Sequence, residues 1–301
     1  MSFSSDVKQE LNKSSNLSNK ELVKYELLGY LMSGNANVID GKILKFKTES
    51  DYNINRFSKL LTNLDIDHKI EIKGKSFVIQ VKVKDLLELV DEKYEMIFLK
   101  SEMRQQILDK KVSEERIRDL IRGIFLGSGS VNDPQKKYHL EVIISNDQNL
   151  RDIVAMLKNF GMKPKILSTE YKHCVYLKEG EEISNFLALI GANKAVLTFE
   201  EIRVQREMRG KVNRIVNCET ANLNKVMNAS IEQIEAIQKL KKNGKFNKLD
   251  DNLKEIAELR LENPDMPLVE LGKLLKNPVG KSGVNYRLKK LVELADLKNV
   301  K

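Results

Sequence analysis

The sequence predicts an α+β protein, with a duplicated unit of helices and strands followed by an all-α domain. Two observations support this class. In residues 1–199, apolar side chains alternate with a period of two and then recur at helical spacing, and this order occurs twice. In residues 249–301, the apolar positions show helical spacing only. With 301 residues, the chain is long enough to bury two separate cores.

The two copies of the duplicated unit are offset by 96 positions. Leu44 and Phe46 alternate with lysines, and Leu140 and Val142 repeat this phase 96 positions later. The other predicted elements also correspond: opening helices at 23–31 and 117–125, middle helices at 54–64 and 150–160, strands at 69–72 with 77–81 and at 165–168 with 173–177, and closing helices at 85–90 and 183–190. We therefore expect two halves of the αββαβ type about a pseudo-twofold axis.

Each opening helix ends in a short run of small and polar residues, MSGN in the first half and GSGS in the second. Gly29 in one helix, and Gly123 and Gly127 in the other, would let two backbones approach closely. We expect the two helices to pack together at the seam between the halves. These glycines then serve helix packing and not catalysis.

The run LIRGIFLGSGS at residues 120–130 resembles the motif of LAGLIDADG homing endonucleases. In those enzymes, a helix packs against its symmetry mate and ends with an acidic residue that holds the metal. Here the acidic positions are occupied by Leu126 and Ser128, and in the first half by Leu31 and Ser33. Leucine offers no oxygen, and a neutral hydroxyl is a poor ligand for a hard divalent cation. We expect no catalytic residue, no metal site and no cofactor.

A surviving endonuclease is an alternative with a definite requirement. Metal-assisted hydrolysis of a phosphodiester would need a pair of carboxylates near the twofold axis. The acids nearest to the second motif are Asp133 and Glu141, and both lie beyond it. Another hypothesis is an interaction scaffold for division or chromosome proteins, in which DNA binding is minor and the sheets of the duplicated domain form the docking surface.

The predicted organisation has four segments. The first half is 1–96, and the second half is 97–199, of which residues 97–116 join the halves as a helix plus linker. A helical linker at 200–248 follows, and a helix-turn-helix domain occupies 249–301.

The linker is expected to be a long, polar, interrupted helix with a break at 241–245. Its first part carries five basic side chains that are candidates for phosphate contacts, namely Arg203, Arg206, Arg209, Lys211 and Arg214. A solvated linker helix without such contacts explains them equally well.

The last segment shows three helices. The first begins at Asp250 or Asp251 and must stop before Pro264, and the third begins at Ser282 as its N-cap. The side chains expected in the core are Leu253, Ile256, Ala257 and Leu261 in the first helix, Leu268, Leu271 and Leu275 in the second, and Val284, Leu288, Leu291 and Ala295 in the third.

A proline and a glycine at 277–281 mark a short turn between the second and third helices, which is the helix-turn-helix arrangement. From Lys281 to Lys290 there are four basic residues and no acid, which suits a helix in the major groove of DNA. The predicted contacts to double-stranded DNA are Lys281, Ser282, Asn285, Tyr286, Arg287, Lys289 and Lys290. A small helical bundle for protein contacts is the alternative.

Charge and composition agree with a nucleic-acid partner. The net charge is +9, and residues 200–301, with 21 basic and 15 acidic side chains, hold two thirds of it. Apolar runs are too short to span a bilayer, and MSFSSDVKQE lacks the features of a signal peptide, so we expect no membrane contact. Two isolated cysteines, Cys174 and Cys218, are typical of the reducing cytoplasm.

The whole chain resembles the WhiA family of bacterial regulators. The resemblance rests on MSFSSDVKQEL at the start, LIRGIFLGSGSVNDPQKKYHLE in the middle, VNRIVNCETANLNK at 212–225, and IAELRLENPDMPLVELGKLL with KSGVNYRLKKL near the end. It implies a degenerate LAGLIDADG domain tied to a helix-turn-helix domain that binds promoter DNA in the nucleoid. It also implies roles in transcription, in sporulation where the host sporulates, and otherwise in cell division or chromosome segregation. A partner protein docked on the duplicated domain is a further expectation.

Overall fold

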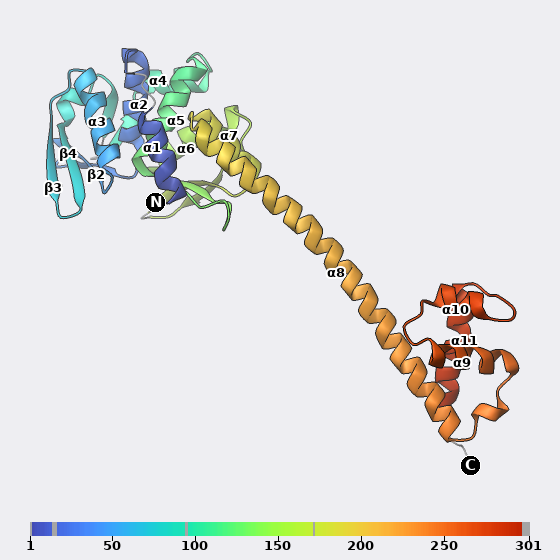
Figure 1. Ribbon diagram of the computed structural model, residues 1–301. Helices are drawn as coiled ribbons and strands as arrows, with labels where there is room; N and C mark the ends of the chain where they lie inside the picture. Colours follow the sequence, from blue (N-terminus) through green and yellow to red (C-terminus); the bar gives the residue numbers. More distant parts are fainter. Residues whose placement is uncertain (1, 14–16, 94–95, 171, 297–301) are drawn as a thin grey trace. The chain divides into compact units, whose positions relative to one another are not determined.

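The computed structural model describes residues 2–13, 17–93, 96–170 and 172–296. Contacts divide the chain into two compact units, Met1–Glu207 and Met208–Lys301, and each is described by itself. Helix α8 (Asn193–Lys242) begins in the first unit and continues into the second (Figure 1).

The first unit contains the duplication that the sequence predicts. Its first half comprises α1 (Phe3–Lys13), α2 (Lys20–Met32), β1 (Ala36–Ile39), β2 (Ile43–Thr48), α3 (Asp51–Asn63), β3 (His68–Lys73) and β4 (Ser76–Lys82). Its second half comprises α5 (Glu114–Ser128), β7 (Gly129–Val131), β8 (Leu140–Ile144), α6 (Asp147–Asn159), β9 (Lys165–Ser168), β10 (His173–Leu177) and α7 (Gly180–Leu189).

The two antiparallel sheets have the same topology. Their strand orders are β1-β2-β4-β3 and β7-β8-β10-β9, and α3 and α6 each contact the sheet of their own half (Figure 1). Each of these two sheets therefore has four strands, where the sequence predicted three in each half. The missed strands, β1 and β7, are only four and three residues long and follow directly on the Gly/Ser motifs, so they lack a visible alternation.

Two predictions for the region between the halves differ from the structure: the first is wrong, and the second is confirmed for its helix but misses a strand. The helix expected at 85–90 is a short 3₁₀ helix, η1 (Val83–Leu86), followed by strand β5 (Val90–Lys93). The segment expected as helix plus linker contributes strand β6 (Met96–Leu99), which pairs with β5, before α4 (Ser101–Leu108). The buried side chains of Val90, Ile97 and Leu99 give this pair an apolar face, which stabilises strands over a solvated helix.

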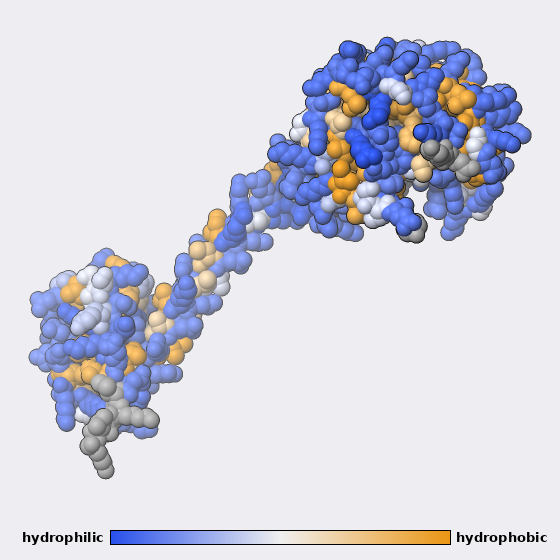
Figure 2. All heavy atoms as spheres, turned by 180° about the vertical axis from the view of Figure 1, so that it is seen from behind, coloured by the Kyte–Doolittle hydropathy of each residue, from blue (hydrophilic) through white to orange (hydrophobic). Residues whose placement is uncertain are grey.

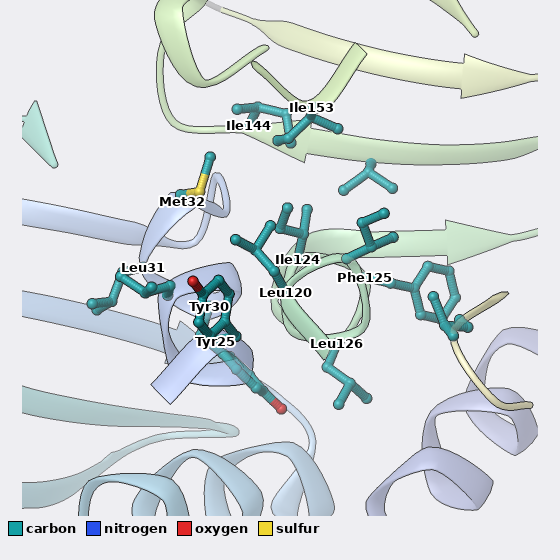
Figure 3. Packing of buried hydrophobic residues seen from close by; sticks show 14 of the residues in the cluster. Tyr25, Tyr30, Leu31, Met32, Leu120, Ile124, Phe125, Leu126, Ile144 and Ile153 are labelled. Atoms are coloured by element: carbon teal, nitrogen blue, oxygen red, sulfur yellow. The ribbon is translucent and has the colours of Figure 1, made fainter. Parts of the chain in front are cut away.

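Helices α2 and α5 pack at the seam between the halves, as predicted. A Cβ atom at Gly29 would collide with the carbonyl oxygen of Leu120, and one at Gly123 would collide with that of Glu26. Only glycine allows this approach of two helix backbones. Figure 3 shows the apolar side chains around the contact, among them Tyr30 and Ile124.

The duplication extends to buried polar contacts. Ser50 caps α3 by accepting a hydrogen bond from the N–H of Asn53, and Asn146 caps α6 by accepting one from the N–H of Asn149. The side chains of Asn53 and Asn149 are buried and donate to the carbonyl oxygens of Leu126 (2.7 Å) and Ile97 (2.8 Å). Each half therefore uses an asparagine in its middle helix to satisfy a backbone carbonyl of a neighbouring element.

The second unit consists of the remainder of α8, a short 3₁₀ helix η2 (Phe246–Lys248), and helices α9 (Asp251–Glu262), α10 (Leu268–Leu274) and α11 (Lys281–Asp296). The predicted break after Lys242 is confirmed, with Gly244 at φ +66°. Before this break, α8 runs unbroken for 50 residues. No proline occurs in this stretch, and the single Gly210 is tolerated inside the helix.

Candidate nucleic-acid interface

Helices α9, α10 and α11 pack around one core with the end of α8. This core consists of Ala236, Ile237 and Leu240 from α8, Leu253, Ile256 and Ala257 from α9, Leu271 and Leu275 from α10 and its C-cap, and Val284, Leu288, Leu291 and Ala295 from α11. Two predicted core positions, Leu261 and Leu268, are only partly buried. The predicted N-cap is also wrong, because α11 begins at Lys281 and Ser282 lies in its first turn.

The turn between α10 and α11 depends on a close backbone contact. The N–H of Val279 donates to the carbonyl oxygen of Gly272 at 3.1 Å. A Cβ atom at Gly272 would collide with the carbonyl oxygen of Val279. The turn therefore folds directly onto α10, which determines how α11 leaves it.

The loop between α9 and α10 is held by Arg260, a residue that the sequence reasoning missed. The side chain is 2% exposed, and its Nη1 donates to the carbonyl oxygens of Asn263, Pro264 and Met266 at 3.4, 3.1 and 2.9 Å. The hydroxyl of Ser230 on α8 also donates to Pro264, at 2.5 Å. Burial lowers the pKa of the Arg260 guanidinium, and the charge of Asp265 partly offsets this. The spacing from Leu253 through Ile256 and Ala257 to Arg260 is that of the apolar face, and this signal could have revealed it.

The predicted contact residues on α11 divide into two groups. Ser282, Tyr286 and Lys289 lie on the face opposite the buried residues, with Tyr286 67% exposed. Lys281 and Asn285 are also exposed beside this face.

The other two predicted residues, Arg287 and Lys290, are half-buried. The Nη1 of Arg287 is shielded and has no hydrogen-bond partner in the described part of the chain, and Lys290 borders a cavity lined by Leu240 and Leu253. Two exposed lysines near the turn, Lys273 and Lys276, were not predicted. Lys273 lies in the first helix of the helix-turn-helix pair and Lys276 lies in the turn, and these positions could have suggested both as DNA contacts.

The five basic residues of the linker all lie on α8 and differ in their surroundings. In the first unit, Arg203 pairs with Glu200 at 3.0 Å. The guanidinium of Arg206 lies 4.5 Å from the centroid of the Tyr138 ring and donates to the carbonyl oxygen of Pro134 at 2.5 Å. The remaining three, Arg209, Lys211 and Arg214, lie in the second unit and are exposed.

The four degenerate acid positions contain no carboxylate. Leu31 and Leu126 are fully buried. The hydroxyl of Ser33 donates to the carbonyl oxygen of Tyr30 at 2.7 Å, and that of Ser128 donates to the carbonyl oxygen of Ile143. Both hydroxyls therefore donate to backbone carbonyl oxygens.

The two acids nearest to the second motif are engaged separately. Asp133 accepts from the N–H of Gln135 at 2.9 Å. Glu141 lies within 3.7 Å of the thiol of Cys174, within 3.6 Å of Lys172 and within 3.5 Å of His139. Within the described ranges, no three His, Cys, Asp or Glu side chains are grouped so that they could hold a metal ion.

Comparison with known proteins decides the family. Residues 117–209 match the model of the WhiA LAGLIDADG-like domain, and residues 212–295 match that of the WhiA C-terminal HTH domain. A protein named "Probable cell division protein WhiA" from Clostridium tetani is 37% identical over 314 residues, covering 98% of each chain. This chain belongs to the WhiA family. A WhiA relative of the same name from Clostridium novyi is 36% identical over 311 residues, again with 98% coverage of each chain.

Solved WhiA structures resemble the fold. The crystal structure of full-length DUF199/WhiA from Thermatoga maritima has a TM-score of 0.59 at 26% identity and covers 98% of each chain. The N-terminal LAGLIDADG domain of DUF199/WhiA has a TM-score of 0.51 at 21% identity, covering 63% of this chain and 90% of that one. The WhiA assignment thus confirms the predicted fold class of a LAGLIDADG-like domain joined to a helix-turn-helix domain.

None of the described helices combines the length and the apolar character that crossing a bilayer requires.

Proposed function

We propose that this WhiA-family chain is a non-catalytic, DNA-binding regulator of transcription that acts in cell division. The observation that carries the proposal is the surface of α11. Ser282, Tyr286 and Lys289 lie on one exposed face, supported from behind by the core of the second unit. A helix presented in this way fits the major groove, where long polar side chains reach base edges and phosphates.

Two further features support a regulator without nuclease activity. The positions where a LAGLIDADG enzyme carries its metal-binding acids hold Leu31, Ser33, Leu126 and Ser128. Asp133 and Glu141 bond to separate partners and do not form the carboxylate pair that two-metal hydrolysis needs. The names of the relatives agree with a role in cell division. Within this proposal, the ligand is promoter DNA in the nucleoid.

The test compares the full chain with a chain that ends at Lys248, which lacks α9, α10 and α11. Both are mixed with genomic DNA fragments in the presence of Mg²⁺, and DNA mobility and length are followed. The proposal predicts retarded, intact DNA with the full chain and none with the shortened one. Cut DNA would establish an endonuclease, and retention of binding by the shortened chain would move the DNA contact to the first unit.

A second candidate function, a docking scaffold for division or chromosome proteins, is favoured by the edge strands. Strand β3 carries the exposed Ile70 and Ile72, and strand β9 carries the exposed Ile166 and Leu167. Edge strands with exposed apolar side chains favour association with another chain. An Ile72→Lys, Leu167→Lys protein that still binds DNA but no longer binds a purified division protein would establish this role; unchanged binding of that protein would remove it.

A further inference from the structure

In the second unit, helix α8 carries an apolar surface that the described residues leave uncovered. From Met208 to Ile231, eight apolar side chains are each between 50 and 65% exposed, namely Met208, Val212, Ile215, Val216, Leu223, Val226, Met227 and Ile231. Figure 2 shows apolar patches along this helix. Scattered apolar residues are normal on a protein surface, but a row of them along one face of a helix indicates an interaction site. We call these eight residues the α8 stripe.

The α8 stripe follows an 11-residue repeat. Ile215, Val226 and Ile237 are spaced by 11, and so are Val212, Leu223 and Ile234. Because 11 residues make close to three turns of an α-helix, residues at this spacing lie on one face. At the C-terminal end of the row, Ile237 is fully buried among α9, α10 and α11. The continuation of the stripe thus already packs against helices, while the part before it faces solvent.

The local sequence does not explain why this part of α8 is helical. Residues 212–222 read VNRIVNCETAN, and most of these residue types have low helix propensity because they are β-branched or compete for backbone hydrogen bonds. Most helices in proteins are stabilised by packing an apolar face and not by propensity. A helix with this composition, exposed on every side, needs a partner on its apolar face.

We propose that the α8 stripe binds a second copy of this chain, with the two helices antiparallel. Full burial of an apolar side chain removes roughly 60–120 Å² from water, so the eight residues would bury on the order of 500–950 Å² per chain. A stable interface buries about 800 Å² per partner. A row with an 11-residue repeat fits a helix with the same repeat, and a second α8 provides one through a self-complementary twofold contact.

The antiparallel direction follows from the charges. Glu219 is the one carboxylate on the face of the stripe between Met208 and Ile231. A parallel pair would place Glu219 against its own copy and would also bring together the basic residues near Arg209. An antiparallel pair with its twofold axis between residues 220 and 221 places Ile215 opposite Val226 and Glu219 opposite Asn222. This register avoids both contacts between like charges.

Self-association is tested by sedimentation velocity of the full chain at 1–100 μM. The wild-type protein is expected at twice the 34.6 kDa mass of one chain. Ile215→Lys with Val226→Lys should sediment as a monomer. Asn217→Lys with Asn228→Lys is the matched control, because it adds the same charge at the same spacing on the opposite, exposed face, and it should remain a dimer. A monomeric wild type, or equal behaviour of the two variants, would overturn the proposal.

The orientation of the two helices is tested by cross-linking in a Cys218→Ser background. This test compares folded variants only, so its result does not depend on destabilising the chain. Ile215→Cys and Val226→Cys proteins are treated with a short thiol-to-thiol cross-linker, separately and as a mixture. The antiparallel pair predicts a cross-linked dimer in the mixture alone. Cross-linked dimers of the separate proteins would show a parallel pair, and no cross-link in any sample would remove the interface. These results do not depend on DNA binding, so the proposed function can fail while this inference stands.

Discussion

The guanidinium of Arg56 on α3 forms a bidentate ion pair with the carboxylate of Glu26 on α2. Nε lies 2.8 Å from Oε1 and Nη2 lies 2.7 Å from Oε2, and both side chains are no more than 3% exposed. Although burial alone would lower the pKa of Arg56, the hydrogen bond and the charge of Glu26 raise it. The pair joins the seam helix to the middle helix of the same half, beside a second pair of Arg122 and Asp119 at 2.5 Å.

Removing one member of this pair should be costly. Arg56→Met leaves the carboxylate of Glu26 buried without its main partner, and we expect a loss of about 3–5 kcal/mol in the free energy of unfolding. Lys20→Met is the control, because Lys20 and Asp65 form an exposed pair at 3.2 Å that contributes at most about 1 kcal/mol. Urea unfolding of both variants measures the difference. Similar small losses would show that the buried pair does not stabilise the first unit.

Asp119 should make stability depend on pH. Burial raises the pKa of Asp119 to about 6, despite the charge of Arg122, which lowers it. The folded chain therefore holds a proton on this carboxyl more tightly than the unfolded chain. Its contribution is favourable below about pH 4 and is lost as the pH rises to about 6.

The check is a comparison with Asp119→Asn, which does not titrate. The unfolding free energy of the wild type relative to this variant should fall by about 2–3 kcal/mol between pH 4 and pH 7, on the order of two pKa units. Urea unfolding at both pH values gives this double difference. A constant difference, or one that grows with pH, would contradict the raised pKa.

Two glycines inside helices should respond in opposite ways to replacement by alanine. Gly123→Ala places a methyl group against the carbonyl oxygen of Glu26, and we expect a loss of about 1–3 kcal/mol from overpacking. Gly210→Ala has open space around it and removes a flexible residue from α8, so a gain of about 0.5–1 kcal/mol is expected. Thermal unfolding of each variant against the wild type tests both signs. If the Gly123→Ala protein is as stable as the wild type, the helices at the seam can move apart without loss of stability.

Periodic apolar patterns predicted the parts of the fold that have long, regular elements. The 96-residue offset located both halves, because equivalent helices and strands bury equivalent side chains. The same reasoning failed for β1 and β7, which are too short to alternate visibly, and for β5 and β6, where charged neighbours concealed the apolar face formed by Val90, Ile97 and Leu99. Short strands are determined by the sheet they join and not by their own sequence.

The candidate interface was predicted in part for a similar reason. Helical spacing separated the buried residues of α11 from Ser282, Tyr286 and Lys289 on its opposite face. Spacing alone did not distinguish Arg287 and Lys290, whose long side chains are half-buried along the edges of the helix. Arg260 was missed because its carbonyl partners belong to a loop whose path depends on the folded unit.

The dependence of DNA affinity on salt tests the role of α11 most directly. Affinity of the full chain for a DNA fragment that it retards is measured from 50 to 200 mM KCl for the wild type, for Tyr286→Ala with Lys289→Ala, and for Lys254→Ala as a control on α9. We expect weaker binding by the α11 variant, with a slope of log affinity against log salt that is shallower by about one unit, and little change in the control. Equal affinity and equal slope for the α11 variant and the wild type would show that these residues of α11 do not contact DNA.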